Sequence, residues 1–450
     1  MGRRMAVVAA AGVAAVLAGG IVMPAAAAAE AAATGVGCST PALVSALSQA
    51  TSGATLSLAT NCTYVLTAAL PTVAQSLTIN GNGATLQRST ATGTAAFTIL
   101  TMTAGTVTLH RLSFTNGNGA IAVENVAQLT VTGGVFSNNT GVNGAAIDNT
   151  GGSVVEAVGT SFIDNTATGD GGAMFVYTAL EDQIIECRFV GNTAGGDGGA
   201  YWEASNGTAI SGSTFQGNKA TNGGALFFDD QGSGITGTTI DDNSATQDGG
   251  GIYDSPGGGP VVIADSKITG NHAGRTGGGL DEESPGSLGS ITSTKIDDNS
   301  AADGGGINDG NGTFIQYTGD TFYGNQASRD GGAINAIGSG LSFTGTTIWG
   351  NHAGGDGGGV DNGTGSESQP ASFTDSTISY NVAGDRGGGL YNQGSVDVSG
   401  TQITGNRAVH GGGGIYDAGT EATVTLTGSS PAGNKPDNCA PRGSITGCTG

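Results

Sequence analysis

Apolar residues recur along this chain at fixed distances from an asparagine. In TTIWGNHAGGDGGGVDN (346–362), Ile348 stands three residues before Asn351, and a glycine run leads to a second aliphatic residue, Val360. The pattern occurs eleven times between about residues 130 and 420, at intervals of 25 to 30 residues. Its asparagines are Asn139, Asn165, Asn192, Asn218, Asn243, Asn271, Asn299, Asn325, Asn351, Asn381 and Asn406. A period of this length predicts a solenoid or a propeller.

The residues before each asparagine predict a β-strand. Three positions earlier stands Phe or Ile in every copy, and two positions before that the residue is small, usually Ser or Thr. Residues two apart point to the same face of a strand, so both columns should face inward. Cys187 occupies the small column in one copy. We therefore expect it to be a small buried side chain rather than a reactive thiol.

The residues after the glycines predict a second strand that begins with an inward aliphatic column. A third short strand fits the remaining residues, as in PVVIADSK (260–267), with a turn at each asparagine. Four strands of a propeller blade need more sequence, and Gly, Ser, Thr and Asn disfavour helix interiors. Stacked asparagines should hydrogen-bond as a ladder. The predicted fold is all-β, a right-handed, single-stranded parallel β-helix of about fifteen coils spaced ~4.8 Å apart.

The two ends of the repeat array are expected to be capped. At the N-terminus, Thr40 and Pro41 begin a predicted cap helix with one apolar face formed by Leu43, Val44, Leu47 and Ala50. Two cysteine pairs suit disulfides in an oxidising compartment, Cys38 with Cys62 and Cys439 with Cys448. The expected organisation is a signal peptide at 1–29, the cap and first coils at 30–110, β-helix repeats at 111–430, and a disulfide-closed tail at 431–450.

The N-terminus and the charge restrict location and partners. Two arginines, an apolar stretch and an alanine run are typical of a secretory signal peptide, with an uncleaved anchor as the alternative. We expect a secreted or cell-surface monomer without stable membrane insertion after signal removal. A formal net charge of −22 disfavours nucleic acid. It also disfavours anionic polysaccharides unless a divalent cation bridges the charges.

The pairing of F/I-x-x-N with GGA/GGG followed by an aliphatic residue resembles the repeats of polymorphic outer membrane proteins. That resemblance implies a right-handed parallel β-helix of the pectin-lyase-like superfamily and an adhesin-like surface role. The membrane barrel of that family has no counterpart in this sequence. The broader shape is also similar to pectate lyases and polygalacturonases, although fold alone does not carry their chemistry.

One surface strip is the candidate site. Directly after the second inward column, four consecutive repeats carry Phe175, Trp202, Phe227 and Tyr253, which alternation turns outward. With Glu203 beside them, they would form a sugar-binding strip of flat rings and hydrogen-bond acceptors. The alternative is that a neighbouring loop or a register slip buries these rings.

The acidic residues allow a catalytic alternative. Asp230, Asp254 and Glu282 lie one or two coils apart, within the separation that glycosidase carboxylates need. A lyase would need a basic residue, and none joins this group. Asp before Gly-Gly, as at Asp303 and Asp330, is typical of a turn, with a Ca²⁺ ladder as the alternative. The scattered histidines predict no metal site, and no other cofactor is expected.

The sequence therefore favours a non-catalytic, adhesin-like or structural rod that binds a polysaccharide, a cell-surface glycan or another surface partner. The alternative is a carbohydrate-active enzyme, more in keeping with a glycoside hydrolase than with a polysaccharide lyase, acting in a groove along the β-helix.

Overall fold

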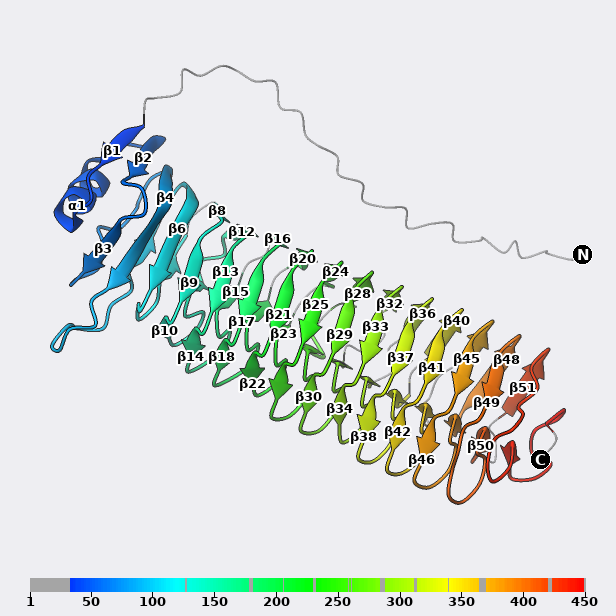
Figure 1. The fold of residues 1–450 in the computed structure, drawn as a ribbon. Helices are drawn as coiled ribbons and strands as arrows, with labels where there is room; N and C mark the ends of the chain where they lie inside the picture. Colours follow the sequence, from blue (N-terminus) through cyan, green and yellow to red (C-terminus); the bar gives the residue numbers. More distant parts are fainter. Residues whose placement is uncertain are drawn as a thin grey trace, which may run out of the picture. The chain divides into compact units, whose positions relative to one another are not determined.

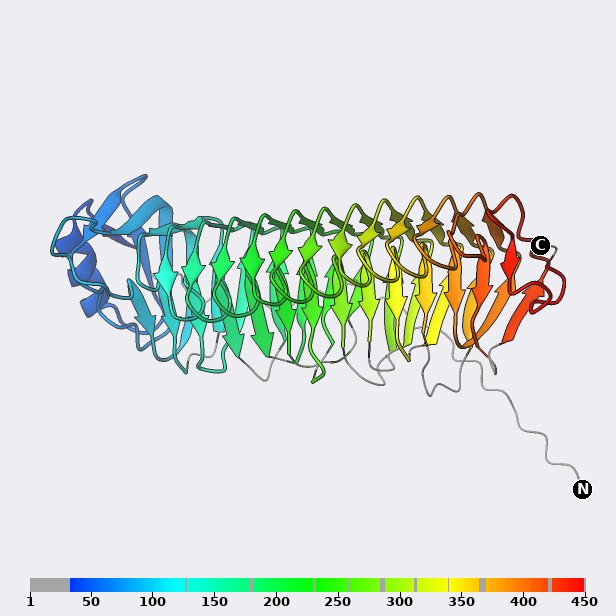
Figure 2. The ribbon, with the colours of Figure 1, turned by 90° about the horizontal axis from the view of Figure 1, so that it is seen from below.

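The computed structural model describes residues 33–125, 128–177, 181–204, 206–229, 232–257, 259, 261–283, 288–310, 314–338, 340–363, 370–419 and 423–448. The predicted signal peptide and Asp230 lie outside these ranges. Within them, one α-helix near the N-terminus lies at the start of a stack of parallel strands that forms a β-helix (Figures 1 and 2). The predicted fold class is confirmed, and the winding is consistent with the right-handed sense expected for parallel crossovers.

Three parallel sheets form the walls of the β-helix. Sheet A has 28 strands, sheet B has 14 and sheet C has 10. A typical turn contributes two short strands to sheet A, one two-residue strand to sheet C directly after the asparagine, and one strand to sheet B after the glycines. PVVIADSK contains β28 (Val262–Ala264), as expected. The sheet C strands occupy residues where the sequence predicted only a turn.

The strands of sheet B are β5 (Leu100–Met102), β7 (Ile121–Val123), β11 (Ile147–Asn149), β15 (Met174–Tyr177), β19 (Tyr201–Ala204), β23 (Leu226–Phe228), β27 (Ile252–Asp254), β31 (Leu280–Glu282), β35 (Ile307–Asp309), β39 (Ile334–Ala336), β43 (Val360–Asn362), β47 (Leu390–Asn392), β50 (Ile415–Asp417) and β52 (Cys439–Ala440). Those of sheet C are β10 (Thr140–Gly141), β14 (Thr166–Ala167), β18 (Thr193–Ala194), β22 (Lys219–Ala220), β26 (Ser244–Ala245), β30 (His272–Ala273), β34 (Ser300–Ala301), β38 (Gln326–Ala327), β42 (His352–Ala353) and β46 (Val382–Ala383).

Sheet A comprises β1 (Thr34–Val36), β2 (Ala54–Leu58), β3 (Thr63–Leu66), β4 (Leu77–Arg88), β6 (Thr106–Thr115), β8 (Gln128–Thr132), β9 (Val135–Ser137), β12 (Val154–Val158), β13 (Ser161–Ile163), β16 (Asp182–Ile185), β17 (Arg188–Val190), β20 (Thr208–Ser211), β21 (Thr214–Gln216), β24 (Gly234–Thr236), β25 (Thr239–Asp241), β28, β29 (Lys267–Thr269), β32 (Leu288–Thr292), β33 (Lys295–Asp297), β36 (Phe314–Thr318), β37 (Thr321–Tyr323), β40 (Gly340–Thr344), β41 (Thr347–Trp349), β44 (Ala371–Thr374), β45 (Thr377–Ser379), β48 (Ser395–Ser399), β49 (Gln402–Thr404) and β51 (Thr423–Thr427).

The predicted inward columns form the core. The Phe or Ile three residues before each asparagine is fully buried, and so is the aliphatic or aromatic residue that opens each sheet B strand. Consecutive phenylalanines of the first column stack at 4.5 to 5.1 Å, from Phe114 to Phe215. Cys187 is buried, and its thiol donates to the carbonyl oxygen of Ala157 at 3.3 Å. Its predicted structural position is confirmed.

The asparagines form the predicted ladder. Each side-chain amide donates to Oδ1 of the next asparagine at 2.9 to 3.2 Å. The ladder runs from Asn139 to Asn406 and continues through two further asparagines, Asn434 and Asn438, which lie outside the eleven repeats seen in the sequence. Because these amides are buried, each hydrogen bond satisfies a group that water cannot reach.

A pairing inside each turn links the core column to the glycines. Where the core residue is Phe, as at Phe189 or Phe322, the residue before the sheet B strand is Ala; where it is Ile, as at Ile268, that residue is Gly. A Cβ added at Gly279 would lie 3.0 Å from Cγ2 of Ile268 and 2.7 Å from the carbonyl oxygen of Gly306. The β-branch of isoleucine therefore occupies space that an alanine Cβ needs in the other repeats.

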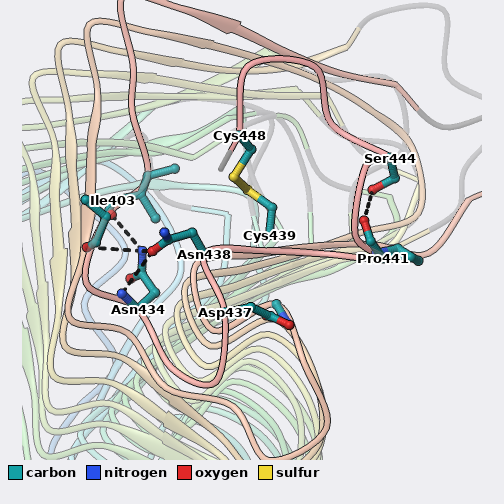
Figure 3. The surroundings of a disulfide bond; sticks show 10 residues. Ile403, Asn434, Asp437, Asn438, Cys439, Pro441, Ser444 and Cys448 are labelled. Atoms are coloured by element: carbon teal, nitrogen blue, oxygen red, sulfur yellow. Dashed lines mark hydrogen bonds between the residues drawn. A yellow bond between two sulfur atoms is a disulfide. The ribbon is translucent and has the colours of Figure 1, made fainter. Parts of the chain in front are cut away.

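Both ends carry the expected disulfides. Cys38 is bonded to Cys62, and Cys439 is bonded to Cys448. Figure 3 shows the second disulfide beside Asn434 and Asn438, the last residues of the ladder. The tail therefore seals the final turn.

The N-terminal cap helix is α1 (Thr40–Gln49). Its N-cap is Ser39, whose hydroxyl oxygen accepts a hydrogen bond from the backbone N–H of Ala42. Leu43 and Leu47 are buried, whereas Val44, expected on the same face, is exposed. The cap helix is confirmed with a narrower apolar face than predicted.

Candidate functional site

The four aromatic residues of the predicted strip form a stack on the outer face of sheet B. Phe175, Trp202, Phe227 and Tyr253 are register partners on neighbouring strands, and their ring centroids are 4.3, 6.1 and 5.2 Å apart. The interplanar angles of 7°, 10° and 23° show face-to-face stacking. The outward orientation that alternation predicted is therefore correct.

The exposure predicted for this strip is wrong at two of its positions. Phe175 is 9% exposed and Phe227 is 7% exposed, while Trp202 and Tyr253 are half-buried. The two middle rings, Trp202 and Phe227, are also stacked on a neighbouring ring at both faces. A sugar could therefore contact their edges but not the flat faces that sugar stacking needs. The stack serves the packing of four consecutive turns.

The described candidate acids face the interior, which corrects the sequence-based site. Glu203, Asp254 and Glu282 each lie in a sheet B strand two residues after an inward side chain, and all three are buried. Residues two apart share a strand face, so these carboxylates cannot line an outer groove. Asp254 and Glu282 therefore do not form the surface carboxylate pair that the glycosidase alternative assumed.

Hydroxyl groups stabilise the buried Glu203. Its carboxylate accepts hydrogen bonds from the hydroxyls of Thr208 and Ser233, the latter at 2.7 Å. The Tyr201 hydroxyl lies 2.8 Å from that of Thr208. Burial, with a smaller contribution from Glu203, raises the pKa of Asp182 to about 8. This interior cluster is part of the core rather than a surface site.

The aspartates before the glycines act as turn residues. The backbone N–H of Asp197 donates to Oδ1 of Asp170 at 2.9 Å, and that of Asp356 donates to Oδ1 of Asp330 at 2.7 Å. Each carboxylate thereby holds the next turn in register. Among the residues that the structure describes, no group of three or more His, Cys, Asp or Glu is arranged to hold a metal ion. The expectation of a Ca²⁺ ladder therefore gains no support here.

A polar chain continues the outer column of sheet B beyond Tyr253. The hydroxyl oxygen of Thr276 lies 2.6 Å from Oδ1 of Asp248 and 2.7 Å from Oδ2 of Asp281. The hydroxyl can donate its one hydrogen to only one of these carboxyl groups, so the other contact needs a proton on the carboxyl group. Burial raises the pKa of Asp281 to about 8, so Asp281 carries the second proton at neutral pH. The amide of Asn308 donates to Asp281, and that of Asn335 donates to Asn308, both at 2.7 Å.

Exposed aromatic side chains lie instead on the outer face of sheet A. Tyr323 and Trp349 are register partners on β37 and β41, and their rings stack at 4.0 Å. They are 38% and 40% exposed, and Tyr380, on the following turn, is 65% exposed. In the sequence, these residues follow the inward Phe or Ile by one or two positions, where most repeats carry small or polar side chains. That departure from the repeat was the signal that could have identified them.

Three segments match the Chlamydia polymorphic membrane protein repeat: residues 212–229, 237–255 and 321–337. The chain carries repeats of this type. Each matched segment contains an inward Phe or Ile, a ladder asparagine and the aliphatic residue that opens a sheet B strand, so the match confirms the resemblance in the packing motif. The matched segments cover well under half of the chain. A comparison with curated protein sequences gave no match.

Among solved structures, this chain is similar to tailspike protein 3 of bacteriophage CBA120, with 15% sequence identity and a TM-score of 0.39. The likeness covers 89% of this chain and 59% of the tailspike chain. In the described part of the repeat chain, no helix is both long enough and apolar enough to cross a membrane.

Proposed function

We propose that this chain is a secreted or surface-associated, adhesin-like rod that binds glycans without catalysis. The observation that carries the proposal is an exposed aromatic patch: the stacked pair Tyr323 and Trp349 on sheet A, and Tyr380, which lies on the following turn just after β45. Most other large aromatic side chains of the described residues are buried in the core or in the sheet B stack. Exposed aromatic side chains on successive turns are typical of surfaces that contact sugars or partner proteins.

Trp349 offers the most favourable surface within this patch. One face of its indole stacks on Tyr323, and its register partner on the next turn is Ser379, whose short side chain cannot cover the other face. Thr321, Thr347 and Thr377 lie two residues before Tyr323, Trp349 and Ser379 on the same outer face, where they provide hydroxyl groups. An open ring face beside hydrogen-bonding groups suits the mixed polar and apolar surface of a pyranose ring.

The test is retention of the purified mature protein on immobilised plant, fungal and bacterial polysaccharides. Trp349→Ala should weaken retention on the bound polysaccharide at least about tenfold, which corresponds to ~1.4 kcal/mol. Two matched controls should retain binding: Trp202→Ala, the same substitution in the sheet B stack, and Tyr177→Ala, an exposed aromatic residue outside the patch.

The same assay addresses the enzymatic alternative. Newly formed sugar ends in the supernatant would contradict a non-catalytic role. Equal retention of wild-type protein and Trp349→Ala would contradict the patch as the binding surface. Absence of retention on every polysaccharide would contradict glycan binding and leave a structural rod or a protein-binding adhesin.

A further inference from the structure

A second surface feature lies on the outer face of sheet B, around β39 and β43. It is a pocket of about 290 Å³, close to the lower end of the range for small-molecule sites. Its lining includes the side chains of Asp303, Arg329, Asp330, Asn335, Asp361 and Gln393. The polar chain that starts at Asp248 ends at this pocket, because Asn335 is its last amide.

Each side-chain donor group that lines the pocket already makes at least one hydrogen bond within the protein. Arg329 donates to both carboxylate oxygens of Asp303, with an Nε to Oδ1 distance of 3.0 Å. The amide of Asn335 donates to Oδ1 of Asn308 at 2.7 Å, and that of Gln393 donates to the Tyr391 hydroxyl at 3.0 Å. Arg329 keeps further N–H groups at the exposed side of the pocket, but its charge is already paired with Asp303.

Acceptors, in contrast, are left over. Asp361 is 9% exposed, its side chain makes no hydrogen bond within the described residues, and its Oδ1 is fully buried. The amide of Asn335 points its nitrogen at Asn308, so its own Oδ1 receives no hydrogen bond from the described residues. A buried carboxyl oxygen without a donor costs stability, and Asp361 differs from Asp320, which has the same feature, because it also lines a pocket that a donor can enter.

The charges around the pocket are also unbalanced. Arg329 pairs with Asp303, and Arg386 pairs with Asp356 at 3.0 Å, whereas no described basic side chain forms an ion pair with Asp330 or Asp361. Burial, followed by the negative charges of Asp330, Asp356 and Asp303, raises the pKa of Asp361 to about 8, against the opposing effect of Arg386. Asp361 therefore holds a proton at neutral pH while the pocket is empty, and a positive ligand that displaces this proton would pair with the carboxylate and with the negative charges around it.

From this excess of buried acceptors and negative charge, we infer that the pocket binds the protonated primary amine of an amino sugar. An ammonium group has three donors and no acceptor, which matches Asp361, Asp330 and Oδ1 of Asn335. The half-exposed Ile337 and the backbone of Gly363 form a wall against which a sugar ring can pack. The inference rests on the proposed glycan-binding function and names a sugar class for it.

The experiment is isothermal titration calorimetry at about pH 7. The probes are glucosamine oligosaccharides, their N-acetylated counterparts, which lack the charge, and glucose oligosaccharides. We expect the glucosamine oligomer to bind at least tenfold more tightly than the N-acetylated one. Protons should be released on binding, because the ammonium group lowers the pKa of Asp361.

Three variants test whether the pocket is the binding site for the amine. Asp361→Asn should abolish the preference for the amine, while Asp397→Asn, at an exposed aspartate on β48, should keep it. Arg329→Gln removes the competing cation from Asp303 and should tighten binding of the amine severalfold. A gain of affinity cannot arise from misfolding, so this variant remains informative even where Asp361→Asn is unstable.

Several outcomes would overturn the inference. These are equal binding of acetylated and free amines, unchanged amine binding in Asp361→Asn, or Asp361-dependent binding of calcium chloride without an amine preference. Retention of neutral glycans through Trp349 without an amine preference would overturn this inference and leave the proposed function standing. Loss of all glycan binding would overturn both.

Discussion

The side-chain amide of Asn271 donates a hydrogen bond to Oδ1 of Asn299 at 3.0 Å and another to the carbonyl oxygen of Ile240 at 3.0 Å. Its own Oδ1 accepts from the backbone and the side chain of Asn243, also at 3.0 Å. One buried side chain thus joins three consecutive turns. Because water does not reach these groups, removal of the amide leaves several partners unsatisfied at once.

We therefore predict that Asn271→Ala lowers the free energy of unfolding by about 3 kcal/mol or more. Urea denaturation followed by far-ultraviolet circular dichroism measures the change. Gln402→Ala, at an exposed amide on β49, is the matched control and should lie within about 0.5 kcal/mol of wild type. A similar small effect for both variants would show that the ladder does not hold the turns together.

The contact between Ile268 and Gly279 predicts a compensating pair. Gly279→Ala should destabilise the protein by about 1–3 kcal/mol, because the new Cβ meets both Cγ2 of Ile268 and the carbonyl oxygen of Gly306. Ile268→Phe with Gly279→Ala recreates the combination found in five other repeats. The double variant should recover about 1 kcal/mol or more relative to the sum of the single effects.

A double-mutant cycle from thermal or urea unfolding gives this coupling. Strict additivity of the two substitutions would mean that the correlation between Phe and Ala along the sequence has another origin. The clash with Gly306 persists in the double variant, so complete recovery is not expected.

Asp320 predicts a dependence of stability on pH. It takes the place that Ser or Thr holds in most repeats, and its Oδ2 is buried without a hydrogen-bond partner. Burial raises its pKa to about 7. A raised carboxyl pKa means that the folded state keeps a proton that the unfolded state releases, so stability falls as pH rises from about 4 to about 7.

Asp320→Thr should remove this penalty and restore the hydroxyl of the column. We expect the free energy of unfolding to rise by about 1–3 kcal/mol at about pH 8.5, and by less at about pH 4.5. Melting temperatures of both proteins across this range measure the difference. An effect of equal size at both pH values would show that ionisation of Asp320 is not its cause.

The repeat itself was predictable from sequence because its packing is periodic. Ile348, Asn351 and Val360 each belong to a column that holds one chemical type through every turn, so one strand register explains all copies. The strands of sheet C could not be anticipated, because each is only two residues long. Ala353 belongs to a column of small residues two positions after the asparagine, but one inward position per copy fits a turn as well as a strand. These residues form strands only because the neighbouring turns offer backbone partners.

The candidate site was predicted less well, for a geometric reason. Alternation from Tyr201 turns Trp202 outward but returns Glu203 to the interior, so an aromatic residue and the acid beside it cannot share one surface. The stacking of Phe175, Trp202 and Phe227 also depends on the distance between turns, which converts separate exposed rings into a packed column. Asp361 escaped notice because nothing in the sequence shows that its carboxylate lacks a donor.

The pairing of Ile268 with Gly279 has a consequence for how such chains change in length. Both residues belong to the same turn. Every turn also contributes one ladder asparagine, which makes the same hydrogen bonds to the turn before it and to the turn after it. Duplication or loss of a segment that runs from one inward Phe or Ile to just before the next therefore keeps each complementary pair together and leaves the ladder contacts at the junction unchanged. Because both ends are sealed by separate caps, the gene can lengthen or shorten the rod in steps of ~4.8 Å without redesign of either end.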